Sequence, residues 1–291
     1  MLVDSVVPMT VPTLASVASD VSPFRAAYAR LTEVLPSLGV TETTAREPLP
    51  EGPGWVRAAA LATGGEALDA FLAWDEEQIL RDHGRPGRPD VAASFGLHRY
   101  AWPVCLLVTV PWFLQRRVPR LPVEAVAIQR SQGRLAVRIE EFACLPDDPA
   151  AAAPGARVVP GEEALRAEVR DAVATHLAPL LEGFRPRMRR GARALWGMVT
   201  DEITEGLWYL GHLLGEESRA RAEAELLLPG AVAPFAQGAG FRELPGPGGA
   251  ALTTRDRASC CLYYTLRPED TCVTCPRTCD AERIERMTVV R

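Results

Sequence analysis

The chain has 291 residues, of which 47% are hydrophobic and 24% are charged. These values are ordinary for a globular protein and argue against wholesale disorder or a membrane-spanning class. The 32 basic and 37 acidic side chains give a net charge of −5, so there is no basic excess for phosphate and no nucleic-acid partner is expected. All basic residues are arginine, which excludes a lysine nucleophile or Schiff base.

Neither a secretion signal nor a membrane span is expected. The first residues lack the basic stretch and the continuous apolar core of a signal peptide. The most apolar run, 101–114, is shorter than the ~20 residues that a membrane helix needs, and it contains Pro103 and Pro111. We therefore expect a cytoplasmic protein with no transmembrane segment.

The chain opens with predicted helices. Ser22-Pro23 is typical of a helix start, with a hydroxyl cap followed by proline at the first helical position. A second helix is expected over 66–81, and a third apolar segment over 91–114 with a bend at Pro103. The apolar stripes of the first two helices are Phe24, Tyr28, Leu31 and Leu35, then Leu68, Phe71, Leu72 and Ile79.

The periodicity changes after Pro122. Residues 123–130 and 135–139 are predicted to form an antiparallel hairpin joined through 131–133. In the second strand, large apolar residues alternate with smaller or polar ones, which indicates a strand buried on one face. One hairpin is only marginally stable alone, so it should pack on the preceding helices or join further strands that the pattern does not locate.

The second half is predicted to be helical. Residues 146–161 are rich in Pro, Ala, Gly and Asp without periodicity, which marks a candidate domain boundary. Apolar stripes then predict helices over 165–180, 196–214 and 216–228. A Pro/Gly-rich segment, 245–249, is expected to separate these helices from a cysteine-rich tail.

These elements predict an α+β protein that is mostly helical. We expect an N-terminal α+β domain with a small antiparallel β element over 1–150 and a helical domain over 160–244. The cysteine-rich C-terminal segment is expected to occupy 250–291.

Five of the seven cysteines lie in this last segment, in the pattern Cys260-Cys261-x10-Cys272-x2-Cys275 with Cys279 following. Thiolates at such density in a reducing compartment are usually held ionised by a metal. The Cys-x2-Cys turn has the spacing that brings two sulfurs to one iron or zinc. The pattern therefore predicts a metal centre.

The pattern favours an iron–sulfur cluster over zinc. A zinc ribbon needs two Cys-x2-Cys pairs, whereas Cys260 and Cys261 are adjacent and their side chains diverge in most backbone conformations. A two-iron cluster presents a wider target. A vicinal disulfide would be strained and reducible. Zinc, and redox or incidental thiols, remain as alternatives.

The tail also resembles a known family. Residues 257–264, Arg-Ala-Ser-Cys-Cys-Leu-Tyr-Tyr, followed by the Cys-Val-Thr-Cys-Pro of 272–276, are similar to the C-terminal signature of the FhuF-like ferric-siderophore reductases. Weaker similarity lies in Tyr-Ala-Trp-Pro at 100–103 and Arg-Ala-Leu-Trp-Gly at 193–197. The resemblance implies one [2Fe–2S] cluster with the ligands Cys260, Cys261, Cys272 and Cys275. Cys279 lies outside the family motif and is a spare thiol or a substitute ligand.

The implied activity is that of an oxidoreductase of iron uptake. It passes one electron from the cluster to iron(III) in a siderophore, whose hard oxygen donors hold iron(II) far less tightly, so that reduction releases the iron. No catalytic residue beyond the cluster is required. The alternative is a non-enzymatic zinc or iron–sulfur binding module that senses metal or redox state and acts through a partner.

Two partners are implied, a ferric siderophore and an electron donor. We expect the hydroxamate type of siderophore, because a chain of net negative charge repels strongly anionic complexes. No Gly-x-Gly-x-x-Gly motif follows a predicted strand, so the donor is expected to be a ferredoxin-like protein rather than a nucleotide.

Other conspicuous side chains have ordinary interpretations. A cluster of five arginines is either a docking patch for an acidic electron donor or an anionic ligand or, as we favour, a solvated face. It comprises Arg185, Arg187, Arg189, Arg190 and Arg193. Four tryptophans are more typical of core than of ligand stacking, namely Trp102, Trp112, Trp196 and Trp208. The four histidines, which lack paired spacing, are not expected to bind metal. They are His83, His98, His176 and His212.

Overall fold

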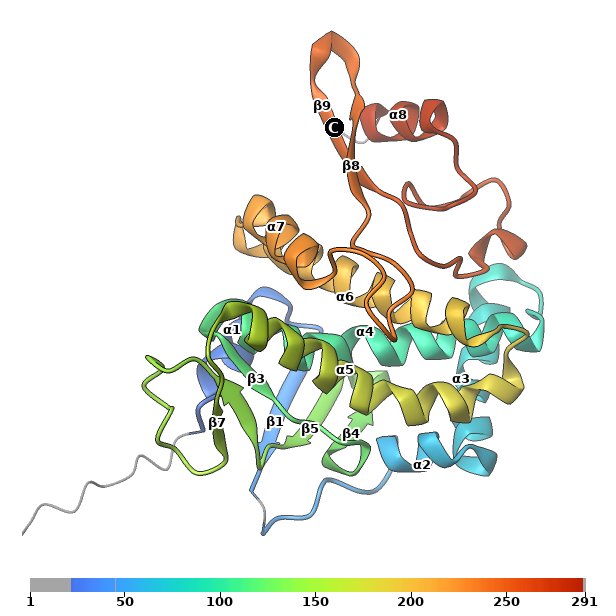
Figure 1. Ribbon diagram of the computed structural model, residues 1–291. Coiled ribbons are helices and arrows are strands. Elements are labelled where there is room, and N and C mark those ends of the chain that lie inside the picture. The colour runs from blue at the N-terminus through green and yellow to red at the C-terminus, as the bar shows by residue number, and fades with distance from the viewer. Residues whose placement is uncertain (1–21, 45, 290–291) are drawn as a thin grey trace, which may run out of the picture.

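The computed structural model describes residues 22–44 and 46–289. Of these residues, 54% are helical and 14% lie in strands, so the architecture is the mixed, mostly helical α+β class that the sequence predicts. The helices pack over small sheets, and a β-hairpin with the final helix beside it extends away from them (Figure 1).

The helices follow the predicted apolar stripes closely. Each of the segments predicted from its periodicity is helical, and the short helices α2 and α8 are additions. The helices are α1 Arg25–Val34, α2 Ala58–Thr63, α3 Gly65–His83, α4 Pro89–Gln115, α5 Glu162–Phe184, α6 Ala192–Leu214, α7 Glu217–Leu227 and α8 Asp280–Val289.

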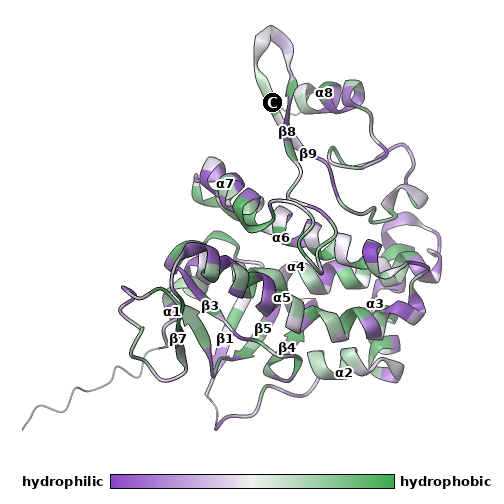
Figure 2. Cartoon of the chain, viewed as in Figure 1, coloured by the Kyte–Doolittle hydropathy of each residue, from purple (hydrophilic) through white to green (hydrophobic). Residues whose placement is uncertain are grey.

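The helix α4 forms the centre of the fold. It continues through Pro103 and Pro111, and it packs against α1, α3, α5 and α6. By length and composition it could span a membrane, yet 78% of its most apolar window is buried inside the protein. Figure 2 shows its apolar colouring in the middle of the helical layer. It is therefore a core helix, apolar on every side because other elements surround it.

The predicted hairpin belongs to a four-stranded sheet. Its strands are β4 (Val126–Gln129) and β5 (Arg134–Arg138), which pair antiparallel, while the residues just before β4 form a 3-10 turn. The sheet order is β1-β5-β4-β2, so the partner strands that the pattern did not locate are β1 (Gly39–Thr43) and β2 (Trp55–Arg57). The first pairs parallel to β5 and the second antiparallel to β4.

The strand β5 is buried on both faces rather than on one. Its Leu135 and Val137 belong to the main core, as the alternation predicts. On the opposite face Ala136 packs with Ala127 and Leu49, beside the partly buried Trp55. The prediction of a half-buried strand is therefore wrong, because the loop that precedes β2 covers the second face.

A smaller sheet occupies part of the predicted domain boundary. Its order is β3-β6-β7, with β3 at Arg117–Pro119, β6 at Phe142–Cys144 and β7 at Ala156–Val158. One hydrophobic cluster includes buried side chains from Phe24 to Ala239, on both sides of this segment. The division into separate domains at this point stays a prediction.

The Pro/Gly-rich segment 245–249 differs from its predicted role as a linker. It forms the turn of a hairpin between β8 (Phe241–Pro245) and β9 (Ala251–Arg255), in which Leu244 faces Leu252. Both leucines are buried. The hairpin therefore joins the helical part of the chain to the cysteine loop through paired backbone rather than through a free connection.

Candidate metal centre

The cysteine loop, residues 256–279, connects β9 to α8 (Figure 1). Cys260 and Cys261 precede a short 3-10 turn at Tyr263–Thr265. Farther on, the N–H of Cys275 donates to the carbonyl of Cys272 at 3.0 Å, which closes the Cys-x2-Cys turn. Both cysteine pairs thus lie on irregular backbone that neighbouring elements must hold in place.

Asp201 of α6 anchors the first half of the cysteine loop. Its carboxylate accepts the backbone N–H groups of Ala258 and Ser259 at 2.8 and 2.9 Å, immediately before Cys260. The same carboxylate pairs with Arg255 at 2.6 Å, and both side chains are fully buried. A buried ion pair needs this full set of hydrogen bonds to offset its desolvation, so loop and helix hold one another.

Gly197 allows α6 to approach the loop closely. A Cβ atom at this position would lie 2.9 Å from the carbonyl oxygen of Ala258 and 3.3 Å from the side chain of Ser259. Glycine in a helix interior costs about 1 kcal/mol relative to alanine. The close backbone contact beside Cys260 is the structural reason for accepting that cost.

The other side of the loop packs on α3 and α4. The buried Ser94 hydroxyl donates to the carbonyl of Cys261 at 3.0 Å. Leu266 is buried in a small apolar cluster with Ile79 and Val91, and Tyr263 stacks on Phe95 (ring centroids 6.3 Å apart). The loop is therefore fixed between two helical surfaces rather than extended into solvent.

Arg283 of α8 connects the second half of the loop to the first. Its side chain is 4% exposed. It donates to the carbonyl of Cys275 at 3.1 Å and to the carboxylate of Asp256 at 3.0 Å. Glu205 of α6 adds a second connection, since it accepts from Arg255 at 2.8 Å and from the Thr274 hydroxyl at 3.3 Å.

Polar donors approach two of the sulfurs. The N–H of Leu262, which has a left-handed backbone (φ +69°), donates to Cys260 Sγ at 3.4 Å. Arg257 and the Thr274 hydroxyl each lie 3.9 Å from Cys272 Sγ. Such donors favour ionised sulfur and tune a bound iron–sulfur centre.

Charges around the thiols influence one another. Burial raises the pKa of Cys261, and the nearby Cys272 and Cys260 raise it further, against the lowering effects of the Tyr263 N–H and Arg257. Burial lowers the pKa of Arg257, but Asp201, Cys261 and Cys272 outweigh it and raise the pKa overall. The Cys261 thiol therefore ionises more readily beside a positive partner, which a metal supplies when it binds.

The donor set fits an iron–sulfur cluster. Thiolates are the usual cluster ligands, and four thiols lie on one anchored loop: Cys275 is buried, Cys260 and Cys261 are partly exposed, and Cys272 is exposed. In the described part of the chain, no three His, Cys, Asp or Glu side chains are gathered at ligating distance. The convergence of all four sulfurs on one centre therefore stays a prediction.

A cleft lies directly beside the cysteines. Its volume is about 540 Å³, within the range of roughly 300–1,000 Å³ that is typical of ligand sites. Cys261 and Cys272 form part of its wall. The remaining lining comes from the same loop, α4 and α6, namely Phe95, His98, Arg99, Glu202, Glu205, Arg257, Tyr263, Asp270 and Thr271.

Comparison with known families decides the kind of centre. Residues 257–277 match the model of the FhuF 2Fe–2S C-terminal domain. The C-terminal segment is a FhuF-type 2Fe–2S domain. The match contains Cys260, Cys261, Cys272 and Cys275 and ends before Cys279, which is exposed and immediately precedes α8. No curated protein matches the chain.

The residues that support the FhuF-type domain from a distance were not recognised in the sequence. Asp201, Gly197 and Ser94 contact the cysteine loop across long sequence separations. Arg283 lies only eight residues after Cys275, but its bond to the Cys275 carbonyl depends on how α8 packs on the loop. Gly197 gave one usable signal, because a glycine inside an apolar helix often marks a close approach.

The other side chains singled out in the sequence have varied surroundings. Trp112 is fully buried as predicted, whereas Trp102 is partly exposed. His98 pairs with Glu202, and His176 is buried between the Tyr100 hydroxyl and the Leu121 carbonyl. Cys105 and Cys144 are both buried.

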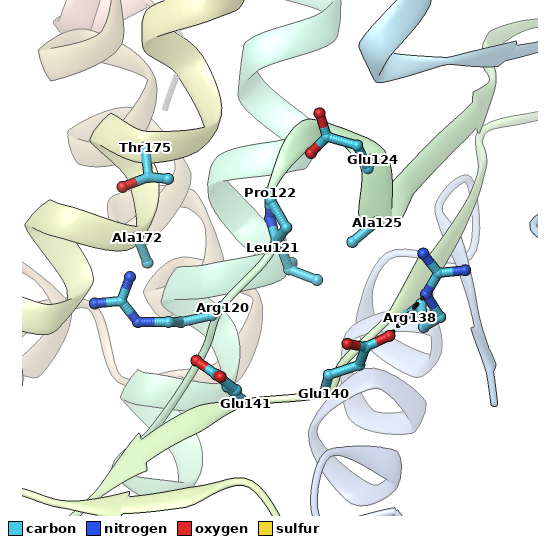
Figure 3. A pocket seen from close by; sticks show the side chains of 10 residues that line it. All are labelled: Arg120, Leu121, Pro122, Glu124, Ala125, Arg138, Glu140, Glu141, Ala172 and Thr175. Carbon is cyan, nitrogen blue, oxygen red and sulfur yellow. Dashed lines mark ion pairs between the residues drawn. The ribbon is translucent and has the colours of Figure 1, made fainter. Parts of the chain in front are cut away.

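A separate cavity of about 330 Å³ does not contribute to the FhuF-type domain. It lies between α5 and the loops of the small sheets (Figure 3), and no cysteine lines it. Its arginines are neutralised, since Arg120 pairs with Asp171 at 2.7 Å and Arg138 with Glu140 at 3.2 Å. This cavity therefore offers no thiolate ligand for an iron–sulfur cluster.

Proposed function

We propose that the protein is a cytoplasmic ferric-siderophore reductase. In this proposal a ferric siderophore binds in the cleft beside Cys261 and Cys272, gains one electron and releases iron(II). The bound [2Fe–2S] cluster supplies a one-electron carrier, whose potential depends on charge, hydrogen bonding to sulfur and exposure. The FhuF-type 2Fe–2S domain supports the kind of centre.

The observation that carries the proposal is the position of the cleft. Cys261 and Cys272 form part of its wall, so a molecule bound there touches the residues expected to ligate the cluster. Cys272 is exposed. One-electron reduction needs this proximity and no nucleophile or general base, and the chain's own role is to bind and orient the complex.

The charges of the cleft favour a siderophore that is not strongly anionic. Glu202, Glu205 and Asp270 place three carboxylates in its lining. The two arginines there are each engaged by a fully buried carboxylate, Arg99 by Asp75 at 2.6 Å and Arg257 by Asp201 at 3.5 Å. Ferric hydroxamates, which are neutral or cationic, suit this lining better than trianionic catecholate complexes.

The electron donor is proposed to dock at the arginine cluster before α6. Arg190 donates to the hydroxyl of Ser259 at 2.9 Å, next to Cys260. Arg185 and Arg187 pair with Glu182 and Asp69. The exposed Arg189 and Arg193 have no carboxylate partner within the described residues, and they would attract an acidic ferredoxin-like protein.

Anaerobic purification followed by stopped-flow kinetics tests the function. We expect a reddish-brown protein with iron and acid-labile sulfide in equal amounts, and rapid oxidation of the dithionite-reduced form by ferrioxamine B, with iron(II) trapped by a chelator. An anionic ferric tris-catecholate should react more slowly at low salt, and the difference should shrink as salt screens the charges. A colourless zinc protein, or a reduced cluster that no ferric siderophore oxidises, would refute the proposal and support the sensor alternative.

A further inference from the structure

A second cavity adjoins the cleft beside the cysteines. Its volume is about 490 Å³. His98, Arg99 and Glu202 line both spaces, so these three side chains form their common wall. We infer, on the basis of the proposed function, that the two spaces form one bipartite substrate site. The iron-chelating head occupies the cleft beside the cysteines, and an uncharged apolar appendage of the same siderophore occupies the second cavity.

The walls of the second cavity are mainly apolar. Apart from the shared residues and Arg130, its lining is Ser37, Leu38, Trp74, Trp102, Pro103, Ile128, Gly133 and Leu135. Leu38, Ile128 and Leu135 are buried, whereas Trp74 and Trp102 are only partly buried. An apolar group that covers these two partly exposed aromatic side chains removes apolar surface from water, which favours its binding in this concave site.

The charged groups of the second cavity are already neutralised within the chain. Asp75 is fully buried, and its two oxygens accept from Arg99 and Arg130 at 2.6 Å each. Arg130 also donates to the Phe71 carbonyl at 2.8 Å, and its guanidinium lies 4.1 Å from the centre of the Trp74 ring. These contacts hold Trp74 in place. Together with Glu202 in the common wall, Asp75 balances the two arginines, so the lining has no net charge to attract an anionic group and the appendage is uncharged.

The common wall provides a polar position between the two spaces. His98 Nδ1 pairs with Glu202 Oε1, and His98 Nε2 is buried without a hydrogen-bond partner among the residues that the structure describes. An amide that joins an acyl group to the chelating head would meet this nitrogen. The site is therefore charged beside the cysteines, polar at His98 and apolar in the second cavity. An acylated siderophore has the same sequence of parts: a chelating head, an amide and an apolar acyl chain.

Ferrioxamine B and its N-octanoyl derivative provide a matched pair of probes, because acylation leaves the iron coordination unchanged. Binding is measured with the redox-inert gallium(III) complexes on the cluster-loaded protein. We expect the acylated complex to bind at least about tenfold more tightly, equivalent to about 1.4 kcal/mol. Trp102→Ala should remove most of this advantage.

Ser37→Phe tests the same point without truncating a packed side chain. Ser37 is exposed at the lining of the second cavity, so a phenyl group there should fill the space without disturbing the core. Ser37→Phe should abolish the tighter binding of the acylated gallium complex while leaving the affinity for the parent gallium complex unchanged. Trp208→Phe is the control, because Trp208 packs against Phe241 and bonds Glu217 and does not line the cavity.

Equal affinity for the two gallium complexes, or an acyl advantage that survives both Trp102→Ala and Ser37→Phe, would overturn the inference. These outcomes are separable from failure of the proposed function. If both iron(III) complexes oxidise the reduced protein but the gallium complexes bind equally, the reductase proposal stands and the bipartite site is wrong. If acylation strengthens gallium binding but neither iron complex is reduced, the second cavity is supported and the reductase proposal is wrong.

Discussion

The carboxylate of Asp201 accepts the backbone N–H of Ser259 at 2.9 Å, one residue before Cys260. This contact links the middle of α6 to the cysteine loop. Because Asp201 also neutralises the fully buried Arg255 at 2.6 Å, the same carboxylate stabilises the end of β9 and the start of the loop. The position of the candidate ligands thus depends on a side chain far away in sequence.

Asp201→Asn should lose both cluster and stability. The amide keeps the shape but removes one of the two carboxylates that neutralise Arg255, the other being Glu205. The loss of stability should therefore be smaller than the about 3–5 kcal/mol that an uncompensated buried charge costs. Urea unfolding and iron analysis of the purified protein measure the two effects. Asp69→Asn is the control, since Asp69 is 57% exposed in its pair with Arg187 and should change stability by less than about 1 kcal/mol. A fully loaded, equally stable Asp201→Asn protein would contradict the anchoring role.

Gly197→Ala should impair cluster binding while α6 remains helical. The added methyl group would lie 2.9 Å from the Ala258 carbonyl oxygen, so the cysteine loop must move. Visible absorption per protein should fall by more than half, with little change in the far-UV circular dichroism. Gly191→Ala is the matched control, because its Cβ would meet no atom within 4 Å. Wild-type cluster content in Gly197→Ala would show that the close approach is unimportant.

Cys279→Ser should leave the cluster absorption intact. Cys279 is exposed and lies outside the matched 2Fe–2S domain, and the four-cysteine motif is complete without it. Cys272→Ser and Cys275→Ser should each abolish most of the absorption, as measured after identical anaerobic purification. Bleaching of Cys279→Ser alone would mean that the ligand assignment is wrong.

Charge reversal at Arg189 and Arg193 should slow reduction by a protein donor. Stopped-flow mixing with a reduced acidic ferredoxin should give a rate constant about tenfold lower than wild type at low salt, with the difference shrinking as salt is added. Reduction by dithionite should be unchanged. The control reverses Arg25 and Arg30 on α1, which alters net charge equally at a helix remote from the cysteine loop (Figure 1). Equal slowing in both variants would argue against a specific docking face.

His176 should make the protein less stable in acid. Burial lowers its pKa to about 4, against an unfolded value of about 6.5. Between these values the unfolded chain binds more protons than the folded one, so stability rises with pH and is lost as pH falls from 6.5 to 4. The loss is up to about 3 kcal/mol.

Unfolding free energies measured across this range test the role of His176. His176→Asn keeps a neutral donor for the Leu121 carbonyl and should flatten the pH dependence. His212→Asn should not, since the His212 side chain is 70% exposed. The same slope in wild type and His176→Asn would assign the acid sensitivity to other groups.

The sequence by itself determined the features that depend on neighbouring residues. The spacing of Cys260, Cys261, Cys272 and Cys275 identified the metal-binding segment, because ligand spacing is a local property. Apolar periodicity located α3, α5, α6 and α7, and alternation with a turn signal located the β4–β5 hairpin. These patterns repeat within one or two turns of backbone, so no knowledge of distant contacts is needed to recognise them.

Only the tertiary structure decided how the segments meet. The parallel pairing of β1 with β5 and the bond from Asp201 to Ser259 join residues far apart in the chain. The segment 245–249 turns a hairpin rather than acting as a linker because buried Leu244 and Leu252 pair across it. The two adjoining cavities arise where α4, α6, the cysteine loop and the four-stranded sheet converge. Such contacts depend on side-chain packing between elements, which no local pattern of residues encodes.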